Sequence, residues 1–395
     1  MRIAFLTHYA TPYGANRSLL DLVLALRAGH GVRPHVLLAA SGPFTDVLER
    51  HAVPFAVVPW KPWVGQRVYM GGAHHRLSQW LGYRRRGHER ERHNVTALPL
   101  LVDACRQWAI DLLHVNSAVI GIGPALSAAV ERPWVWHLRE LIGPHFGFVP
   151  DGGTAAFARR LNAAHAVIAV SDAVRRGVPA RMAGRTPVQV VHNAVHAAAG
   201  SAALAAEAHA RWDRPQPFRL LMVGVFHPAK GQLEAVEAVA RLRAEGLPVT
   251  LTLVGGGDDA AVRERIAALG ITPYVELTGH VDDPRPFYRD AHALLMCSRH
   301  EAFGRVTVEA LTAGLPVIGH RSGGTPELVA DGRNGLLYDD AAMLIDHVRR
   351  LATDPAEARR MGEEALRSPA VARTTAHMAA EVAAIYSAVL ARHAP

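Results

Sequence analysis

A chain of 395 residues is too long for one typical hydrophobic core, so the length predicts two domains. Half of the residues are hydrophobic and a fifth are charged, which is ordinary for a soluble globular protein, and the absence of an unbroken run of 18 apolar residues excludes a membrane span. Two cysteines are too few for a disulfide framework and fit a reducing compartment, while the net charge of +8 favours anionic partners.

The first half of the chain alternates apolar runs with amphipathic stretches, which predicts βαβ units and a parallel sheet. The expected strands are 3–7, 34–39, 54–58, 111–117, 133–140, 166–170 and 188–192. The expected helices are 18–28, 43–51, 97–109, 119–130 and 155–164. Ser171 and Asp172 form the N-terminal cap of a further helix.

Residues 61–95 interrupt this alternation with eight Lys or Arg, two Glu and several interleaved aromatic residues. Such a basic and aromatic segment is typical of a membrane-surface helix or a site for an acidic acceptor. It is also compatible with nucleic-acid binding, or with a solvated and partly disordered insertion.

A second alternating set begins at residue 219. The expected strands are 220–223, 250–254, 275–277, 293–296, 316–319 and 335–338. The expected helices are 232–245, 260–269, one after Gly304, 325–330 and 341–352, and 355–393 is expected to be almost entirely helical.

The alanine-rich segment 196–217 predicts the connection between two domains. We therefore expect a first α/β domain at 1–195, a second at 218–375, and a terminal helix at 376–395. Both domains are doubly wound, and such sheets bind ligands in a cleft outside the carboxyl ends of their strands.

The segment 301–316 carries two carboxylates, Glu301 and Glu309, on either side of Gly304. A glycine at a strand-to-helix turn leaves the first helical N–H groups open to an anion. A carboxylate further along that helix can accept two ribose hydroxyls, so the arrangement suits a nucleotide. Lys230, at the mouth of another helix, can neutralise a diphosphate. Two solvated surface glutamates and a surface lysine are the alternative interpretation.

Other motifs follow expected strands. Gly279 and His280 lie where backbone groups can border a nucleobase, and His137 and Arg139 end a strand at the same kind of edge. Residues 13–18 contain a single glycine, so they do not form a dinucleotide-binding fingerprint, although a diphosphate could still approach their amides.

With these motifs in place, the second half resembles the retaining glycosyltransferases of family 4, which have the GT-B fold. The first half resembles them more loosely. The motifs that carry the likeness are 224–231, 254–257, 279–281, 301–316, 323–327 and 334–338, with 14–15, 114–117, 137–140, 167–172 and 191–193 in the first half. The resemblance implies two Rossmann-like domains facing a cleft, the first binding the acceptor and the second the nucleotide sugar, with the terminal helix packing back on the first.

The resemblance also implies roles for individual residues. Glu301 and His137 would be catalytic, Glu309 would bind the ribose, and Lys230 would hold the diphosphate. The other residues assigned to the donor are Gly14, Ala15, Gly279, His280, Val281, Phe303, Gly304, Arg305 and Val306. Those assigned to the acceptor side are Asn16, Asn116 and Arg139. Family members often carry an arginine where this chain has Val225, and the candidates for that second cation are Arg17, Arg139 and Arg305.

These inferences predict a retaining transferase that moves a sugar from a UDP- or GDP-linked donor to a hydroxyl of a glycan, lipid-linked or small-molecule acceptor. No Asp-x-Asp motif ends a strand, so we expect metal-independent transfer without a cofactor. The expected location is cytoplasmic, with peripheral contact to an anionic membrane through 61–95, and no nucleic-acid partner is expected. The alternatives are a nucleotide-sugar epimerase of GT-B fold and a basic module that binds nucleic acid or membrane.

Overall fold

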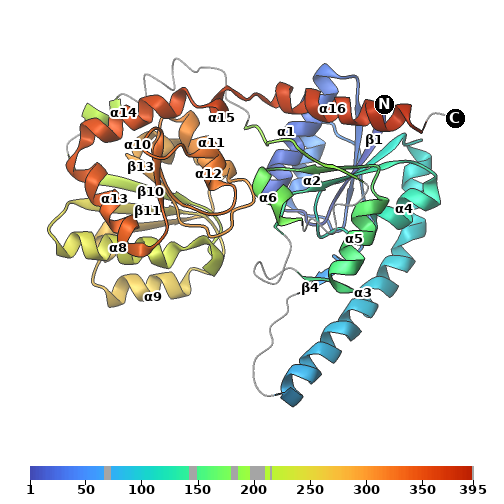
Figure 1. Ribbon diagram of the computed structural model, residues 1–395, viewed down its shortest axis with the longest axis horizontal. Helices are drawn as coiled ribbons and strands as arrows, with labels where there is room; N and C mark the ends of the chain where they lie inside the picture. The colour runs from blue at the N-terminus through green and yellow to red at the C-terminus, as the bar shows by residue number, and fades with distance from the viewer. Residues whose placement is uncertain (66–72, 142–148, 179–185, 196–209, 214–215, 394–395) are drawn as a thin grey trace. The chain divides into compact units, whose positions relative to one another are not determined.

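The computed structural model describes residues 1–65, 73–141, 149–178, 186–195, 210–213 and 216–393, and it separates the chain into two compact units (Figure 1). The first unit consists of Met1–Asn193 together with Thr375–Pro395, and the second of Ala194–Thr374. Most of the expected linker at 196–217 lies outside the described residues.

The main sheet of the first unit has seven parallel strands in the order β3-β2-β1-β5-β6-β8-β9. They are β1 (Arg2–Thr7), β2 (Arg33–Leu38), β3 (Phe55–Val57), β5 (Leu112–Val115), β6 (Trp134–Leu138), β8 (Ala166–Ala169) and β9 (Val188–Val190). The chain builds outwards from β1 to β3 and then returns to the other side of β1. The strand order therefore reverses between β1 and β5, the place where open parallel sheets bind ligands.

The central strands of this sheet are buried along nearly their whole length. Every residue of β5, β6 and β8 is buried, as is every residue of β1 after Arg2. Continuous apolar strands of this kind are typical of a parallel sheet that helices cover on both faces. The helices of this unit are α1 (Gly14–Gly29), α2 (Pro43–Arg50), α3 (Ala73–Gln107), α4 (Gly123–Val130), α5 (Gly153–Ala163), α6 (Asp172–Gly177) and α16 (Thr375–Ala391).

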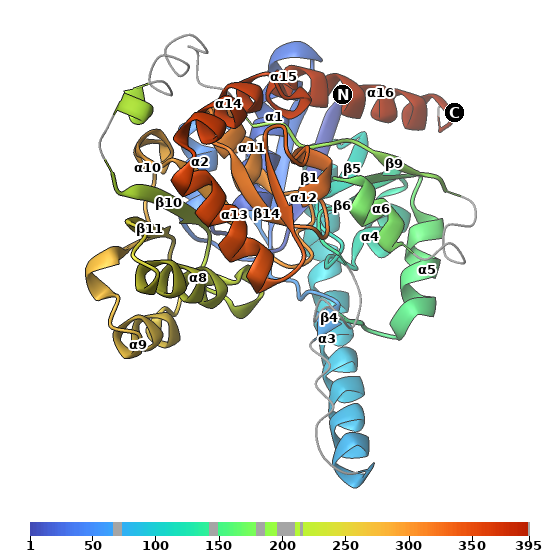
Figure 2. The same ribbon diagram turned by 60° about the vertical axis from the view of Figure 1, so that its left-hand side comes forward.

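Most of the basic segment belongs to one long helix, α3, which projects from the first unit (Figures 1 and 2). The predicted helix at 97–109 is confirmed as part of α3, but its predicted start is wrong, because the helix begins at Ala73 and runs through Pro99 to Gln107. Its first half is largely exposed, with Leu77 and Leu81 exposed by 55% and 54%. The sequence there lacks the apolar stripe by which a packed helix is found.

Two short strands that we did not expect hold α3 to the unit. β4 (Val64–Gly65) pairs antiparallel with β7 (Val149–Pro150). The buried Tyr83 of α3 donates a hydrogen bond from its hydroxyl to the carbonyl of Val149 at 2.7 Å.

Among the described residues, no helix combines the length and apolar character that crossing a membrane requires.

The C-terminal helix α16 packs on α1 of the first unit, which confirms the predicted return of the chain end (Figure 2). It buries Met378, Val382 and Tyr386 completely. The apolar positions recur at intervals of four residues, so one face of the helix is turned towards the unit.

The second unit has a six-stranded parallel sheet in the order β12-β11-β10-β13-β14-β15. The strands are β10 (Phe218–Val223), β11 (Val249–Val254), β12 (Val275–Gly279), β13 (Ala293–Met296), β14 (Val317–His320) and β15 (Gly335–Tyr338). The helices are α8 (Gln232–Ala244), α9 (Ala260–Ala268), α10 (Arg285–Asp290), α11 (Arg305–Thr312), α12 (Thr325–Leu328), α13 (Ala341–Thr353), α14 (Pro355–Leu366) and α15 (Pro369–Ala372), of which α10 was not expected. The strand order reverses between β10 and β13, so the loops after these two strands occupy the expected ligand-binding edge.

Candidate active site

The loops at the strand-order reversal of the second unit bring Lys230 and Glu301 together. Lys230 follows β10, Glu301 follows β13, and Lys230 Nζ lies 2.7 Å from Glu301 Oε2. The side chains are 33% and 18% exposed, so the pair is partly shielded but open to a ligand. Two residues selected separately from the sequence therefore form one charged pair.

A tight turn holds Lys230 in this position. His227 Nδ1 accepts a hydrogen bond from the Ala229 N–H at 3.1 Å, which stabilises the short helical turn ending at Lys230. Gly231 follows with φ of +80°, and a Cβ added there would lie 2.7 Å from Cys297 Cβ. Glycine is needed because it tolerates both the left-handed backbone and this close approach.

A second close contact fixes the backbone of Glu301. The Gly324 N–H donates to the Glu301 carbonyl at 2.7 Å, and the His300 N–H donates to Ser322 Oγ at 3.0 Å. A Cβ on Gly323 would lie 2.2 Å from the same Glu301 carbonyl oxygen. The two glycines noted in the sequence thus allow one loop to pack against the loop that carries the carboxylate.

The environment of Glu301 favours its ionised form. Burial by itself raises the pKa of the Glu301 carboxyl, but the charge of Lys230 and hydrogen bonds from Lys230 and Ser298 outweigh burial and lower this pKa below its usual value. The carboxylate is therefore negative at neutral pH.

Helix α11 begins after Gly304, which has φ of +94° and provides no side-chain cap. The Thr307 and Val308 N–H groups both donate to the Gly304 carbonyl, at 3.0 and 3.3 Å. A helix N-terminus favours an anion, because the positive end of the helix dipole lies there. Further along the helix, Glu309 accepts hydrogen bonds from Tyr288 Oη at 2.9 Å and from Arg305 Nε at 3.2 Å. Glu309 is thereby held at the edge of the sheet, while its oxygens retain further lone pairs.

Phe303 and Val306 flank Gly304 in the predicted donor segment. The Phe303 side chain is 5% exposed and packs inside the unit, so its contribution to a ligand would come from its backbone. Val306 is half-buried in the first turn of α11.

The predicted base-binding residues lie at the end of β12. Gly279 is the last residue of that strand, with φ of +71°, and its carbonyl accepts the Gly255 N–H at 3.0 Å. The His280 side chain is 48% exposed, and Val281 is half-buried. A Cβ on Gly255 would lie 1.9 Å from the Gly224 carbonyl oxygen, so this glycine serves close packing between loops.

In the first unit, His137 lies inside β6 and is fully buried rather than placed at an open strand end. Arg139 is 6% exposed and contacts three side chains. Its Nε donates to Asn116 Oδ1 at 2.6 Å and its Nη1 donates to Asn193 Oδ1 at 2.8 Å. Its Nη2 lies 3.4 Å from His137 Nδ1. The structure therefore brings three of the predicted residues, His137, Asn116 and Arg139, into one buried polar cluster.

Two members of this cluster were absent from the predicted site. His114 Nε2 lies 3.2 Å from His137 Nδ1, and Tyr386 Oη lies 2.7 Å from His114 Nδ1. His114 stood in a motif that we had noted without giving it a role. Tyr386 lies 272 positions away from His114 in a helix, and only its place on the buried face could have suggested a contact.

Gly14, Ala15 and Asn16 form the first turn of α1, whereas we expected that helix to start at residue 18, so the predicted start is wrong. Gly14 is exposed and Ala15 half-buried, and their N–H groups precede the first intrahelical hydrogen bond. Asn16 is buried, accepts the Thr7 hydroxyl at 2.6 Å and donates to two carbonyls of the loop before it. Contact between Asn16 and the acceptor substrate stays a prediction, because the Asn16 side-chain amide already makes hydrogen bonds that shape the loop.

The three candidates for the missing cation have different surroundings. Val225 is 39% exposed at the place where family members often carry an arginine. Arg305 is paired with a carboxylate of its own helix, Arg139 is buried, and Arg17 Nε donates to a loop carbonyl at 3.1 Å. The identity of the second cation stays a prediction.

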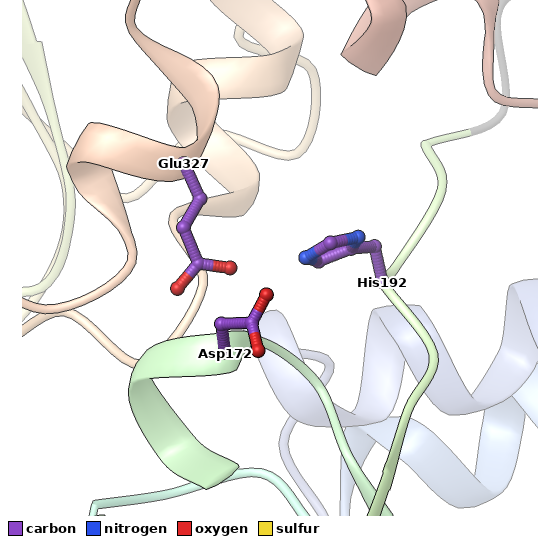
Figure 3. Close-up of side chains that lie close together, drawn as sticks. All are labelled: Asp172, His192 and Glu327. Carbon is purple, nitrogen blue, oxygen red and sulfur yellow. The ribbon is translucent and has the colours of Figure 1, made fainter. Parts of the chain in front are cut away.

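Figure 3 shows Asp172 and His192 of the first unit and Glu327 of the second. The Asp172 carboxylate lies within 4.8 Å of a His192 ring nitrogen and also pairs with Arg175 at 2.6 Å. The first unit therefore supplies two possible metal ligands here, and the charge of one of them, the Asp172 carboxylate, is neutralised by Arg175. A catalytic zinc site needs three protein ligands. Metal-independent transfer stays a prediction.

Two family models match the chain, one after the other. The model for "Glycosyltransferase Family 4" matches residues 12–199, and the model for "Glycosyl transferases group 1" matches residues 206–368. Together they span most of both units.

Curated relatives and solved structures agree with these models. The lipopolysaccharide core biosynthesis glycosyltransferase LpsE of Rhizobium meliloti is 33% identical over 168 residues, which are 42% of this chain and 48% of that protein. A glycogen synthase of Mycobacterium tuberculosis is 30% identical over 283 residues, which are 66% of this chain and 64% of that enzyme. The chain thus matches about half to two-thirds of the length of these relatives.

Among solved structures, Anabaena Alr3699/HepE in complex with UDP and glucose has a TM-score of 0.76 and 23% identity, covering 98% of this chain and 100% of that chain. At this level of identity the likeness establishes the fold, two parallel-sheet α/β domains of GT-B type.

Proposed function

The chain belongs to the family 4 glycosyltransferases, and on this basis we propose that it is a retaining enzyme that transfers a sugar from a nucleoside-diphosphate sugar to an acceptor hydroxyl. The observation that carries the proposal is the Lys230–Glu301 pair at the strand-order reversal of the second unit. A cation for a diphosphate and an anion for a developing sugar cation stand side by side there. We expect UDP or GDP as the carrier, and the UDP bound in Alr3699/HepE supports testing UDP first.

The second unit provides a surface for each part of such a donor. We assign the carboxylate of Glu309 to the ribose hydroxyls and the N-terminus of α11 to the phosphates. We assign the turn at Gly279–Val281, with the half-exposed His280, to the base. No cofactor beyond the nucleotide sugar is required by this assignment.

The reaction follows from where charge develops. As the bond between the anomeric carbon and the phosphate oxygen breaks, negative charge grows on the diphosphate, and the Lys230 ammonium stabilises it. The ionised Glu301 faces the positive charge on the sugar. The acceptor oxygen forms the new bond on the same face of the sugar, and its proton passes to the departing phosphate oxygen. We assign His137 to the sugar as well.

A groove in the first unit supports an anionic acceptor. A cavity of about 760 Å³ lies between α3 and α5, with aromatic rings and arginines in its lining. Arg160 lies over the Trp63 ring at 4.1 Å from its centroid, and Arg84 lies over the Trp80 ring at 5.0 Å. Stacked guanidinium groups beside aromatic rings suit a ligand with an acidic group next to an apolar part.

Contact with an anionic membrane is a further part of the proposal. Leu77 and Leu81 are one turn apart on α3 and more than half exposed, within a strongly basic segment. Exposed apolar residues flanked by arginines are typical of a helix lying on anionic lipid. The two buried free cysteines fit the expected cytoplasmic location. Replacing both leucines by aspartate is expected to reduce binding to phosphatidylglycerol vesicles without changing nucleotide affinity.

The direct test is a screen of UDP- and GDP-sugars by thermal shift, followed by an assay of nucleoside diphosphate release with and without acceptors. A donor is expected to raise the melting temperature by mass action, and release is expected to persist in a chelator. Failure of every nucleotide and nucleotide sugar to bind would refute the proposal.

The two alternatives give different products in the same assays. An epimerase of GT-B fold would convert the nucleotide sugar without any acceptor. A basic binding module would bind nucleic acid or vesicles and leave nucleotide sugars untouched. Membership of the family 4 glycosyltransferases favours the transferase over both.

A further inference from the structure

The buried cluster around His137 contains two hydrogen-bond donors that nothing in the described part of the chain satisfies. His137 Nε2 and Asn116 Nδ2 are both buried and have no partner there. The two residues are 0% and 1% exposed, on and just after neighbouring strands β6 and β5. An unsatisfied buried donor is costly and therefore rare in a native structure. Two of them on neighbouring strands indicate that a ligand oxygen completes the cluster.

The direction of each hydrogen bond in the cluster follows from Arg139. A guanidinium only donates, so His137 Nδ1, which faces Arg139 Nη2 at 3.4 Å, must be the unprotonated nitrogen of its ring. The proton of neutral His137 is then on Nε2. Arg139 Nε donates to Asn116 at 2.6 Å, so the accepting atom must be the amide oxygen Oδ1. The NH₂ group of Asn116 is therefore the end of that amide without a partner.

The directions of the next two hydrogen bonds, from His137 to His114 and on to Tyr386, follow from the proton position on His137. His114 Nε2 lies 3.2 Å from His137 Nδ1 and must donate to it, so His114 Nδ1 is the acceptor of its ring. Tyr386 Oη, at 2.7 Å, therefore donates to His114 Nδ1. Burial, and after it the charge of Arg139, lowers the pKa of His114 to about 3 and that of His137 well below its usual value. Both rings are consequently neutral at pH 7, and each has a single tautomer.

We propose that Tyr386, on the C-terminal helix, is a positioning residue for the transfer reaction: through His114 it fixes the tautomer of His137, so that His137 presents an N–H, and not a lone pair, to a substrate oxygen. His137 is then a hydrogen-bond donor to a hydroxyl or ring oxygen of the substrate and does not act as a base. The role of His137 in transfer rests on the proposed function, whereas the tautomers do not.

Helix α16 thereby has a function beyond packing. The helix is joined to the cluster by the Tyr386 hydroxyl, and this hydroxyl is the outermost donor of the series. If the series ran in the opposite direction, His137 would donate from Nδ1 towards Arg139, and two N–H groups would face each other. Arg139, which only donates, sets this direction at one end. At the other end the Tyr386 hydroxyl can donate or accept, and donation to His114 Nδ1 satisfies its proton inside the buried cluster.

The tautomers can be observed directly by ¹⁵N–¹H correlation spectra of the histidine side chains at pH 7. In the wild-type protein we expect His114 and His137 both to be neutral and protonated on Nε2. A spectrum with His137 protonated on Nδ1, or on both nitrogens, would overturn the proposal. This measurement needs no turnover, so its failure is distinguishable from failure of the proposed transferase activity.

Tyr386→Phe removes only the hydroxyl. We expect mixed tautomers of His114 and a fall in kcat of about threefold to tenfold, the rate equivalent of one hydrogen bond, with an unchanged KM for the donor. Met378→Ala, which removes buried atoms from the same helix two turns earlier, controls for loosening of α16 and should leave both tautomers unchanged. Unaltered tautomers in Tyr386→Phe would exclude Tyr386 as a positioning residue.

A second pair of variants tests the middle of the series. His114→Gln keeps an amide that can accept from Tyr386 and donate to His137, and should retain the Nε2–H form of His137 and most of kcat. His114→Leu keeps neither hydrogen bond and should lose more kcat than His114→Gln. Equal rates in the two variants, with both folded by circular dichroism, would also count against the proposal.

Discussion

Replacing Lys230 by methionine tests the centre of the proposed donor site. The variant keeps most of the side-chain volume but removes the ammonium that lies 2.7 Å from Glu301 Oε2. Glu301, which is 18% exposed, keeps its hydrogen bond from Ser298 and loses the opposite charge. Burial then dominates, so the pKa of the Glu301 carboxyl should rise above its usual value instead of lying below it.

The expected magnitudes follow from these contacts. Loss of a charge-assisted hydrogen bond costs about 1–3 kcal/mol of folding free energy, and the lower end applies because Lys230 is a third exposed. In the reaction, loss of one group that stabilises the leaving diphosphate costs about 3–4 kcal/mol, or about a hundredfold to a thousandfold in kcat. The acidic limb of the pH–rate profile should also move to higher pH, because Glu301 must be ionised.

The chain offers a matched control, because Lys61 is its only other lysine. The assay compares nucleoside diphosphate release and nucleotide affinity by calorimetry for the wild type, Lys230→Met and Lys61→Met. We expect a large loss of rate in the first variant and none in the second. Equal rates for Lys230→Met and the wild type, or an equal loss in both variants, would refute the role of Lys230.

Three further predictions concern other parts of the molecule. Glu309→Ala should weaken nucleotide binding by about tenfold, the loss of one to two hydrogen bonds, and unchanged affinity in calorimetry would remove Glu309 from the ribose role. Gly323→Ala should lower both the melting temperature and the transfer rate, because the new Cβ would lie 2.2 Å from the Glu301 carbonyl oxygen. Gly332 has a similarly positive φ but no atom within 4 Å of the position of an added Cβ, so Gly332→Ala should show the cost of backbone strain alone. Burial lowers the pKa of His8 to about 4 and of His114 to about 3. As the pH falls, the unfolded chain takes up these protons before the folded chain does. The contribution of these two histidines to the free energy of unfolding should therefore be constant above about pH 7 and fall by about 1.4 kcal/mol per histidine for each pH unit below about 6.5. Urea titrations at pH 7, 6 and 5 measure this slope, and a flat profile would contradict it.

The order of strands and helices was largely predictable, because the apolar runs and glycine turns that define them are local. The strand preceding Glu301 and the helix following Gly304 were both found in this way. The long helix α3 was not, because its exposed first half carries no apolar periodicity.

The amino-acid sequence alone determined which loops were selected for the proposed donor site, since a glycine-containing turn after a buried strand is a local pattern with a chemical meaning. It also determined the residue types at that edge, a lysine and two carboxylates. Only the tertiary structure decided that Lys230 and Glu301 form a pair, because their contact depends on β10 lying beside β13 in the sheet. The same holds for Tyr386 and His114: their hydrogen bond spans 272 positions, and no local propensity encodes a contact made by a helix that returns to the first unit from the end of the chain.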